Sequence, residues 1–399
     1  MKIIGIDEQK DVKKINKKKV MIASIVALII LIIVILFIIY CANKPFRDFI
    51  DKYVLMKNVI EDSTKSIILD ENETNNIYAY DKYICVLNKN TLKNYDSSGK
   101  QEGELTIEIS TPITATNGKF LLIAEKEKSK IYLVSGNEII WQKDLEGNID
   151  KIAVNKNGYV AVILSGTTYK SVIQTFDDSG NELFKTYLSS TIAMDIDISL
   201  DNQYLAFLEI NTSGTNIQSI IKIVSIQKAK QKSKDTSIEP ILYTYSEDRG
   251  ALITNIKYQD SNRLLCMYDD GIYVIKNDSN EKILNLIEEG NKISFGGIEL
   301  SNNIFRVIEK TSLLSTQTSV EIMNTGSKKT SIYSFDSTAK EIYSYDDTIA
   351  INVGSEVHFI STNGWLIKKY ISSQEVKKVI MCNNFAGIIY RNKIEIVDI

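Results

Sequence analysis

A short pattern that recurs eight times constrains the fold of this 399-residue chain more than any other feature. Each copy is an apolar residue, a variable residue, two mostly apolar residues, and then a turn-former or a lysine. Successive copies start 37 to 51 residues apart, close to the roughly 40–45 residues that a four-stranded propeller blade needs with its turns. The copies start at Leu92, Ile131, Ile173, Ile221, Ile272, Val320, Val357 and Ile394.

The segments around the copies also have the character of strands. From about residue 75 the chain is rich in Ile, Val, Tyr and Thr, in short runs broken by Asn, Asp, Ser and Gly. A pair of strands precedes most copies, and a turn and another strand follow. We therefore predict an all-β fold, a β-propeller of four-stranded blades. Eight blades are counted; seven is the alternative if one of the weaker copies, with Asn94 or Thr175 at its third position, is spurious.

The two ends of the repeat region are expected to meet. The eighth copy stops at Ile399, so its blade lacks an outermost strand, while a spare strand occupies residues 65–70. If this N-terminal strand completes the last blade, the ring closes without an unpaired sheet edge. We therefore predict that the propeller spans residues 65–399.

One of the turns carries a resemblance to a known repeat. Phe176-Asp177-Asp178-Ser179-Gly180, followed by Phe184, is similar to the repeat of PQQ-type (quinoprotein-like) propellers. The whole chain resembles an uncharacterised family of single-pass, PQQ-like or WD-like propeller proteins of low-GC Gram-positive bacteria. That resemblance implies a membrane anchor and an extracytoplasmic propeller.

A second feature is an uninterrupted apolar segment near the N-terminus. Val20 to Tyr40 contains no charge, glycine or proline. Twenty-one residues of α-helix span about 31 Å, the thickness of a bilayer core. A cleaved signal peptide is the alternative, but its apolar core is normally about 7–15 residues and precedes a small-x-small cleavage site, which is missing here. We expect an uncleaved transmembrane helix over residues 20–41, anchored in the lipid bilayer.

Lysine placement predicts the orientation of this anchor. Residues 1–19 carry seven lysines and three acidic residues, so this tail should stay cytoplasmic and the rest of the chain should lie outside. Apolar residues at helical spacing from Phe46 onward predict a stalk helix or linker over residues 42–62.

Charge and cysteine content exclude several classes of function. The chain has a net charge of -3, so the residues after the +4 tail sum to -7. An acidic domain argues against nucleic acid, whose binders present a basic face. Three cysteines, Cys85, Cys266 and Cys382, lie in apolar stretches without a CxxC pair and are interpreted as buried small hydrophobes.

We predict no catalytic, cofactor-binding or metal-binding residues. The one histidine, His358, occupies the variable position of its repeat, and we interpret that position as solvent-facing. Asp177-Asp-Ser-Gly has its glycine misplaced for an EF-hand, so a hairpin turn is expected. The lysine run from Lys228 to Lys234 is interpreted as a solvated hairpin extension between two strands, with contact to anionic wall polymer or lipid headgroups as the alternative.

These observations favour a non-enzymatic module. Propellers present broad rims of loops on a rigid ring, and function resides in the loops. We expect an extracytoplasmic scaffold that holds an envelope protein partner. The alternative is an extracytoplasmic sensor for a small ligand or glycan; the 19-residue tail is too short for a folded signalling domain.

Overall fold

The computed structural model describes residues 17–42, 50, 65–70, 75–232, 234–247, 250–277, 279–312 and 315–399. The chain divides into two units, residues 1–57 and 58–399. In the first unit, helix α1 covers Lys17–Ala42, and its side chains are described for residues 25–40. Among the residues that the structure describes, no helix has both the length and the hydropathy needed to cross a membrane. The predicted stalk, 42–62, lies almost entirely outside the described residues.

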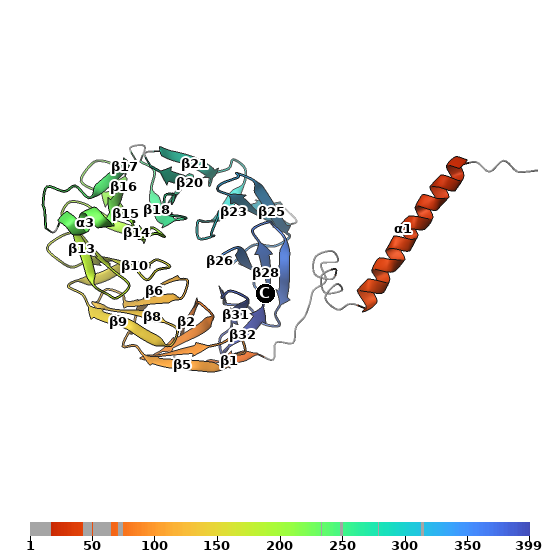
Figure 1. Ribbon diagram of the computed structural model, residues 1–399, viewed down its shortest axis with the longest axis horizontal. Helices are drawn as coiled ribbons and strands as arrows, with labels where there is room; N and C mark the ends of the chain where they lie inside the picture. Colours follow the sequence, from red (N-terminus) through yellow and green to blue (C-terminus); the bar gives the residue numbers. More distant parts are fainter. Residues whose placement is uncertain are drawn as a thin grey trace, which may run out of the picture. The chain divides into compact units, whose positions relative to one another are not determined.

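The second unit is a ring of eight antiparallel sheets with four strands each (Figure 1). In the first four blades, consecutive strands are neighbours from the ring centre outward. Blade 1 is β2 (Asn75–Tyr80), β3 (Tyr83–Asn88), β4 (Thr91–Tyr95) and β5 (Gln101–Thr106); blade 2 is β6 (Pro112–Asn117), β7 (Phe120–Glu125), β8 (Lys130–Ser135) and β9 (Glu138–Asp144); blade 3 is β10 (Asn148–Val154), β11 (Val160–Ser165), β12 (Ser171–Phe176) and β13 (Glu182–Leu188); blade 4 is β14 (Ile192–Ile198), β15 (Tyr204–Asn211), β16 (Gln218–Ser225) and β17 (Ile241–Ser246).

The second half of the ring repeats this order and ends on a composite blade. Blade 5 is β18 (Ile253–Tyr258), β19 (Leu264–Tyr268), β20 (Gly271–Lys276) and β21 (Ser279–Asn285); blade 6 is β22 (Lys292–Gly297), β23 (Asn303–Thr311), β24 (Thr316–Asn324) and β25 (Thr330–Phe335); blade 7 is β26 (Glu341–Tyr345), β27 (Thr348–Asn352), β28 (Glu356–Ser361) and β29 (Leu366–Ile371); blade 8 is β30 (Lys378–Met381), β31 (Phe385–Ile389), β32 (Lys393–Asp398) and β1 (Ser66–Ile68). The predicted all-β propeller with eight four-stranded blades is confirmed.

All eight copies of the sequence pattern form the third strand of a blade. They lie in β4, β8, β12, β16, β20, β24, β28 and β32. Third strands are flanked by strands within their sheet and by neighbouring blades on both faces. Such a position favours apolar residues on both faces of the strand, and the copies are mostly apolar at their first, third and fourth positions.

The hydrophobic core is divided into eight clusters, one between each pair of neighbouring blades. Strand β7 shows how one strand contributes to two of them. Phe120, Leu122 and Ala124 pack toward blade 3, while Leu121 and Ile123 pack toward blade 1. Because side chains alternate between the two faces of a strand, an uninterrupted apolar run supplies both clusters. Cys85, Cys266 and Cys382 are buried and free, as predicted.

Hydrogen bonds and the packing of an aromatic side chain add specific contacts between blades. Asn94, the polar residue of a weak copy, is fully buried; its side-chain amide donates to the Gly136 carbonyl oxygen, 2.9 Å away. The predicted turn at Asp177 joins β12 to β13, and its carboxylate accepts the Ser179 backbone N–H at 3.0 Å. Gly180 in that turn has φ +81°, and a Cβ there would lie 2.8 Å from Trp141 of blade 2. The turn therefore needs glycine for two reasons: its positive φ, and the space that the Trp141 side chain occupies where a Cβ would lie.

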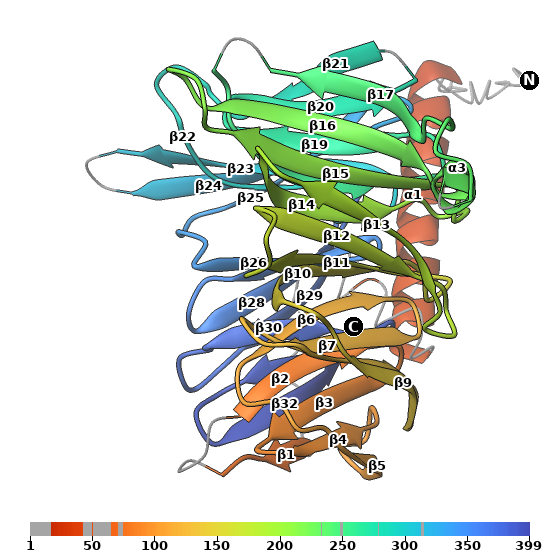
Figure 2. The same cartoon turned by 90° about the vertical axis from the view of Figure 1, so that its left-hand side faces the viewer.

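Strand β1 completes blade 8 by pairing antiparallel with β32 (Figure 2). Ile67 lies opposite Ile394, and only 3% of its surface is exposed. Lys65 adds an ion pair with Asp398 at 3.1 Å. The last blade therefore contains strands from both ends of the propeller, and no open sheet edge remains at the closure.

One sequence interpretation is wrong, and a second is wrong in the conformation it expected. His358 is not solvent-facing: it is 5% exposed, and its Nδ1 lies 3.0 Å from the Tyr333 hydroxyl of blade 6. The variable position of its third strand faces the neighbouring blade rather than solvent, and burial lowers the pKa of His358. The lysine-rich segment lies between the third and fourth strands of its blade with its lysines exposed, as expected, but it forms a short helix, α3 (Ile226–Lys232), that buries Ile226 and Ala229.

Closure of the ring by β1 predicts that alanine substitutions at two adjacent residues of this strand have very different effects on the free energy of unfolding. Ile67→Ala should lower the free energy of unfolding by about 2–4 kcal/mol, because it leaves a cavity in the cluster between blades 8 and 1. Ile68→Ala is the matched control: Ile68 is 76% exposed, so its effect should stay within about 0.5 kcal/mol. Urea unfolding of the full chain measures both values. Equal effects would show that β1 contributes no buried packing.

Candidate functional site

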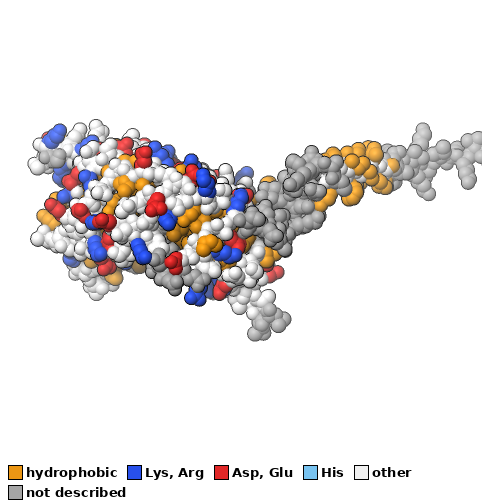
Figure 3. Space-filling view, turned by 90° about the horizontal axis from the view of Figure 1, so that it is seen from below, with side chains coloured by type: hydrophobic (Ala, Val, Ile, Leu, Met, Phe, Trp, Pro, Cys, Tyr) orange, Lys and Arg blue, Asp and Glu red, His pale blue; other side chains and the backbone are white. Residues whose placement is uncertain are grey.

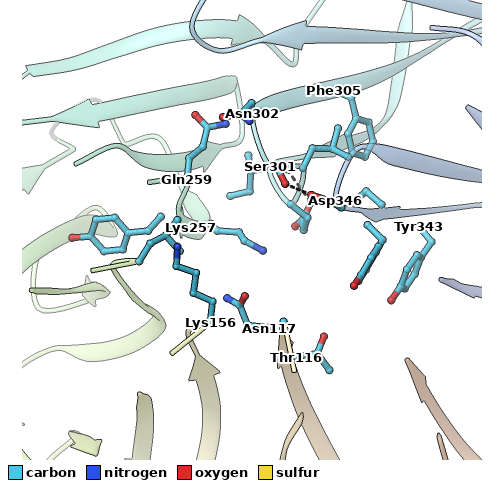
Figure 4. Close-up of a pocket in the computed structure, with 18 of the residues that line it drawn as sticks. Thr116, Asn117, Lys156, Lys257, Gln259, Ser301, Asn302, Phe305, Tyr343 and Asp346 are labelled. Carbon is cyan, nitrogen blue, oxygen red and sulfur yellow. Dashed lines mark hydrogen bonds between the residues drawn. The ribbon is translucent and has the colours of Figure 1, made fainter. Parts of the chain in front are cut away.

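A cavity of about 1000 Å³ lies where the innermost strands end around the ring centre. Its lining comes from seven of the eight blades, mainly from the last residues of the first strands and the loops that lead to the second strands. We call this cavity the channel mouth. Figure 4 shows its side chains converging from strands far apart in the sequence. A site of this kind is assembled only when the ring is closed.

Two lysines lie in the channel mouth. Lys156 is an exposed residue of the loop between β10 and β11, and Lys257 is a partly exposed residue of β18. Among the described residues, neither ammonium group has a carboxylate within 4.0 Å. Both are drawn on the same side of the cavity in Figure 4. The channel mouth thus contains two positive charges without a salt-bridge partner in the described chain.

The acidic residues of the channel mouth are already engaged. Burial raises the pKa of Asp260, but hydrogen bonds from the Asn262 backbone and from Arg263 outweigh it and hold that pKa below its ordinary value. The Arg263 Nε lies 2.6 Å from the Asp260 carboxylate. Asp346 accepts a hydrogen bond from the Ser301 hydroxyl, and Glu299 accepts one from the Ile298 backbone at 2.9 Å. These carboxylates stabilise the loops that carry them.

Aromatic and amide side chains form the rest of the wall. Tyr343 and Tyr345 come from β26, and Phe305 from β23 (Figure 4). The Tyr345 hydroxyl donates to Asn383 of blade 8 at 2.9 Å, which ties the rim to the composite blade. Burial raises the pKa of Tyr343 to about 12, so this side chain is neutral at physiological pH. The carboxamides of Asn117, Gln259 and Asn302 supply donors and acceptors of hydrogen bonds.

Two aspartates of β14 bind the edge of the next inner strand, β18. Asp195 accepts the Ile256 backbone N–H at 2.8 Å and pairs with Lys151 of blade 3 at 3.0 Å. Asp197 accepts the Tyr258 backbone N–H at 2.7 Å. Strand β18 lies at the end of its sheet, so these N–H groups have no strand partner. The two carboxylates therefore hold blades 4 and 5 together next to the channel mouth.

Asp197 has the most clearly shifted carboxyl pKa of this region. The residue is partly exposed, but its carboxyl group lies among protein atoms, and this burial raises its pKa to about 6. Lys257 and the Tyr258 N–H oppose the shift without cancelling it. The folded chain consequently binds this proton more tightly than the unfolded chain does, and ionisation of Asp197 costs stability.

Sequence reasoning named none of the channel-mouth residues. They are single positions in loops of different lengths, and they share no pattern along the chain. The contact beside the channel mouth does have a signal in the sequence, because aspartates alternate with apolar residues in β14, Met194-Asp-Ile-Asp-Ile. Alternating acids in a first strand place two carboxylates on one face, beside the next inner strand. Among the described residues, no group of three side chains is arranged to hold a metal ion.

The raised pKa of Asp197 predicts that the difference in stability between wild type and Asp197→Asn depends on pH. The contribution of Asp197 to wild-type stability should be lost as pH rises from about 4 to about 6, because its folded-state pKa lies above the unfolded value of 3.8. Asp197→Asn keeps an acceptor for the Tyr258 N–H and cannot ionise. Its unfolding free energy relative to wild type should therefore increase across that window, by up to about 3 kcal/mol. Urea unfolding at a series of pH values measures the difference.

Asp197→Ala is the control for the hydrogen bond. It removes both the charge and the acceptor, so it should be less stable than Asp197→Asn by about 1–3 kcal/mol at every pH. A stability difference between Asp197→Asn and wild type that stays constant from pH 4 to pH 7 would contradict the assigned ionisation.

The fold has counterparts among solved structures at low sequence identity. Sqt1 from Chaetomium thermophilum is 10% identical, with a TM-score of 0.53, over 85% of this chain and 99% of that one. The WD40 domain of SCAP from fission yeast is 12% identical, with a TM-score of 0.45, over 85% of this chain and 97% of that one. At these identities the similarity to Sqt1 shows the propeller fold alone.

Two further comparisons concern the sequence itself. No curated protein matches this chain. A family model, described as a family of unknown function (DUF5711), matches residues 57–399 and so covers the entire propeller. The chain therefore belongs to the DUF5711 family.

Proposed function

We propose that this chain is a membrane-anchored, extracytoplasmic scaffold that binds a protein partner of the cell envelope through its propeller. The observation that carries the binding role is the channel mouth, an open cavity of about 1000 Å³ rimmed by loops of seven blades. A rigid ring that presents converging loops is the usual design of a recognition surface. Binding without catalysis is favoured because the carboxylates of the cavity are engaged in holding its loops.

The membrane role rests on the N-terminal segment. The 21 residues from Val20 to Tyr40 are uncharged, and the large apolar side chains described in α1, from Ile25 to Ile39, are all at least 38% exposed. Exposed apolar side chains all around a helix are stable in lipid rather than in water. The lysines of residues 1–19 favour a cytoplasmic tail.

A second candidate function is an extracytoplasmic sensor for a small ligand or glycan. The cavity volume favours it in one respect, because about 1000 Å³ is the upper end of the range for small-molecule sites. A sensor must also pass a ligand-dependent signal across the bilayer, a second requirement that a scaffold does not have. The scaffold is therefore the leading proposal.

The proposed orientation predicts which engineered cysteines react from outside the cell. In a Cys41→Ser background, Ser98→Cys in an exposed turn of blade 1 should react with a membrane-impermeant maleimide on intact cells. Gln9→Cys in the tail should react only after the cells are permeabilised. The three native propeller cysteines are buried and should not react. Labelling of Gln9→Cys but not Ser98→Cys on intact cells would reverse the orientation.

The scaffold predicts a protein partner at the channel mouth. A photo-crosslinking amino acid at exposed Asn302, on the cavity rim, should capture one or two specific envelope proteins in intact cells, identified by mass spectrometry. The matched control is exposed Thr168, in the loop between β11 and β12 at the opposite ends of the strands, which should not capture them. Equal capture from both positions, or capture of nothing beyond the chain itself, would count against a scaffold that uses this face.

A further inference from the structure

The basic helix α3 lies at the same end of the ring as the point where the chain enters the propeller. It directly follows β16, the third strand of blade 4. Lys65 lies at the corresponding end of β32, the third strand of blade 8: its ammonium group pairs with Asp398 at 3.1 Å, and its carbonyl oxygen accepts the Ile396 backbone N–H at 3.0 Å. Third strands run in the same direction in every blade. The entering chain and α3 therefore reach the same face of the propeller, which we call the entry face.

The entry face is also the face of the channel mouth. In an antiparallel blade the first and third strands run in the same direction, so the connection from the first strand to the second and the connection from the third to the fourth lie at the same end. The channel mouth is lined mainly by connections of the first kind, and α3 belongs to a connection of the second kind. A surface that binds α3 consequently also lies in front of the channel mouth.

Helix α3 holds a group of lysines at a fixed place on the entry face. Lys228, Lys230 and Lys232 belong to the helix, Lys234 follows it, and all four residues are exposed. The ammonium groups of Lys228, Lys232 and Lys234 form no ion pair with any described residue. Lys228 and Lys232 are four residues apart on one helix face, where like charges repel each other and destabilise a helix. An anionic partner would offset that repulsion.

The segments next to α3 carry fewer acidic residues than lysines. Residues 226–240, from α3 to the start of β17, contain four lysines against Asp235 and Glu239. On β13, against which α3 packs, Glu182 lies 3.6 Å from Lys185. The two segments together carry five lysines and three carboxylates, a net charge of +2, whereas the chain after residue 19 sums to -7. The surface around α3 is therefore a local basic patch on an acidic chain.

Other charged groups lie away from this patch or are mixed in sign. Asp177 and Asp178 precede β13, but their turn packs on Trp141 of blade 2, and blade 2 lies on the opposite side of blade 3 from α3. Figure 3 shows acidic and basic side chains interspersed over one side of the ring. A run of lysines with few acids beside it thus distinguishes α3 from that mixed surface.

The position of α3 favours membrane lipid over other anions. In the proposed function α1 is anchored in the bilayer, and only the 22 residues 43–64 separate its end from Lys65. Twenty-two residues span at most about 80 Å, so the point of entry remains within that distance of the anchor. A tethered site meets its surface at a high effective concentration. Each lysine close to an anionic membrane also raises the affinity about fivefold, so weak electrostatic contacts are sufficient.

We propose that α3 binds anionic phospholipid headgroups of the membrane that holds the anchor, through its four lysines. This inference rests on the proposed membrane-anchored function and adds an orientation, in which the channel mouth opens toward the bilayer. Ile226 and Ala229 of α3 are buried in the propeller, so the contact is electrostatic and α3 does not insert among acyl chains. The partner bound at the channel mouth is consequently a protein with a segment close to the membrane surface.

Photo-crosslinking to lipid tests this contact in the full chain. A photo-crosslinking amino acid replaces Gln231, an exposed residue of α3, and the chain is reconstituted into nanodiscs of phosphatidylcholine with or without about one third phosphatidylglycerol. Mass spectrometry should detect at least fivefold more lipid adduct when phosphatidylglycerol is present. A rise in NaCl from about 50 mM to about 500 mM should remove this difference, because salt shortens the Debye length. The salt dependence is measured without substituting any lysine, so it does not depend on how the variants fold.

The fourfold variant assigns the contact to the lysines. Lys228→Gln/Lys230→Gln/Lys232→Gln/Lys234→Gln should reduce the phosphatidylglycerol-dependent adduct at Gln231 at least fivefold.

The matched control removes the same charge from the opposite face. Lys126, Lys310, Lys377 and Lys378 are exposed and lie at the other ends of their strands, so replacing these four by glutamine should change the adduct yield less than twofold. A crosslinker at Thr168, which also lies on that face, should give no adduct that depends on phosphatidylglycerol.

Several outcomes would overturn the proposal. Equal yields with and without phosphatidylglycerol, equal yields from Gln231 and Thr168, or an equal loss in both fourfold variants would each do so. Soluble poly(glycerol phosphate) that crosslinks to Gln231 where lipid does not would overturn the assignment to lipid. A chain that does not enter nanodiscs contradicts the membrane anchor of the proposed function and this inference with it. A chain that enters them but forms no lipid contact at Gln231 contradicts this inference alone.

Discussion

The packing of apolar side chains between neighbouring blades is the interaction on which the rest of this structure depends. Within each sheet the backbone hydrogen bonds are local, and they do not determine where one sheet lies relative to the next. The eight clusters do so, because the middle strands of every blade supply side chains to the clusters on both sides. Each blade is therefore stable only between two others, and a ring is the arrangement that gives every blade two neighbours.

This dependence also explains how the channel mouth is held. Its residues belong to loops, yet each loop begins at the end of an inner strand whose position is set by two clusters. Polar contacts refine the arrangement: Asp195 and Asp197 join blades 4 and 5, and Tyr345 joins blade 7 to blade 8. The cavity can thus present charged and amide groups from distant parts of the sequence at fixed relative positions. Preorganisation of this kind lowers the cost of ordering a binding site.

The fold was predictable from sequence to the extent that burial on both faces leaves a pattern. The third strands show it, since Ile131-Tyr-Leu-Val and its equivalents are mostly apolar at the first, third and fourth positions of each copy. Where a polar residue takes such a position, as Asn94 does, a hydrogen bond to the next blade replaces the apolar contact, and no sequence pattern reports that partner. His358 was misjudged for the same reason. The channel mouth was not predictable, because Lys156 and Lys257 are recognisable as neighbours only once the ring is closed.

The completion of blade 8 by β1 has a mechanical consequence. Tension applied at the N-terminal end of the chain reaches the ring first through β1, a three-residue strand held to β32 and packed through Ile67. The chain that follows, beginning with β2 of blade 1, is pulled on directly only after that strand has been detached. The element that completes the last blade is thus also its point of attachment, so a force strong enough to detach β1 would first strip blade 8 of its outermost strand and expose the edge of β32.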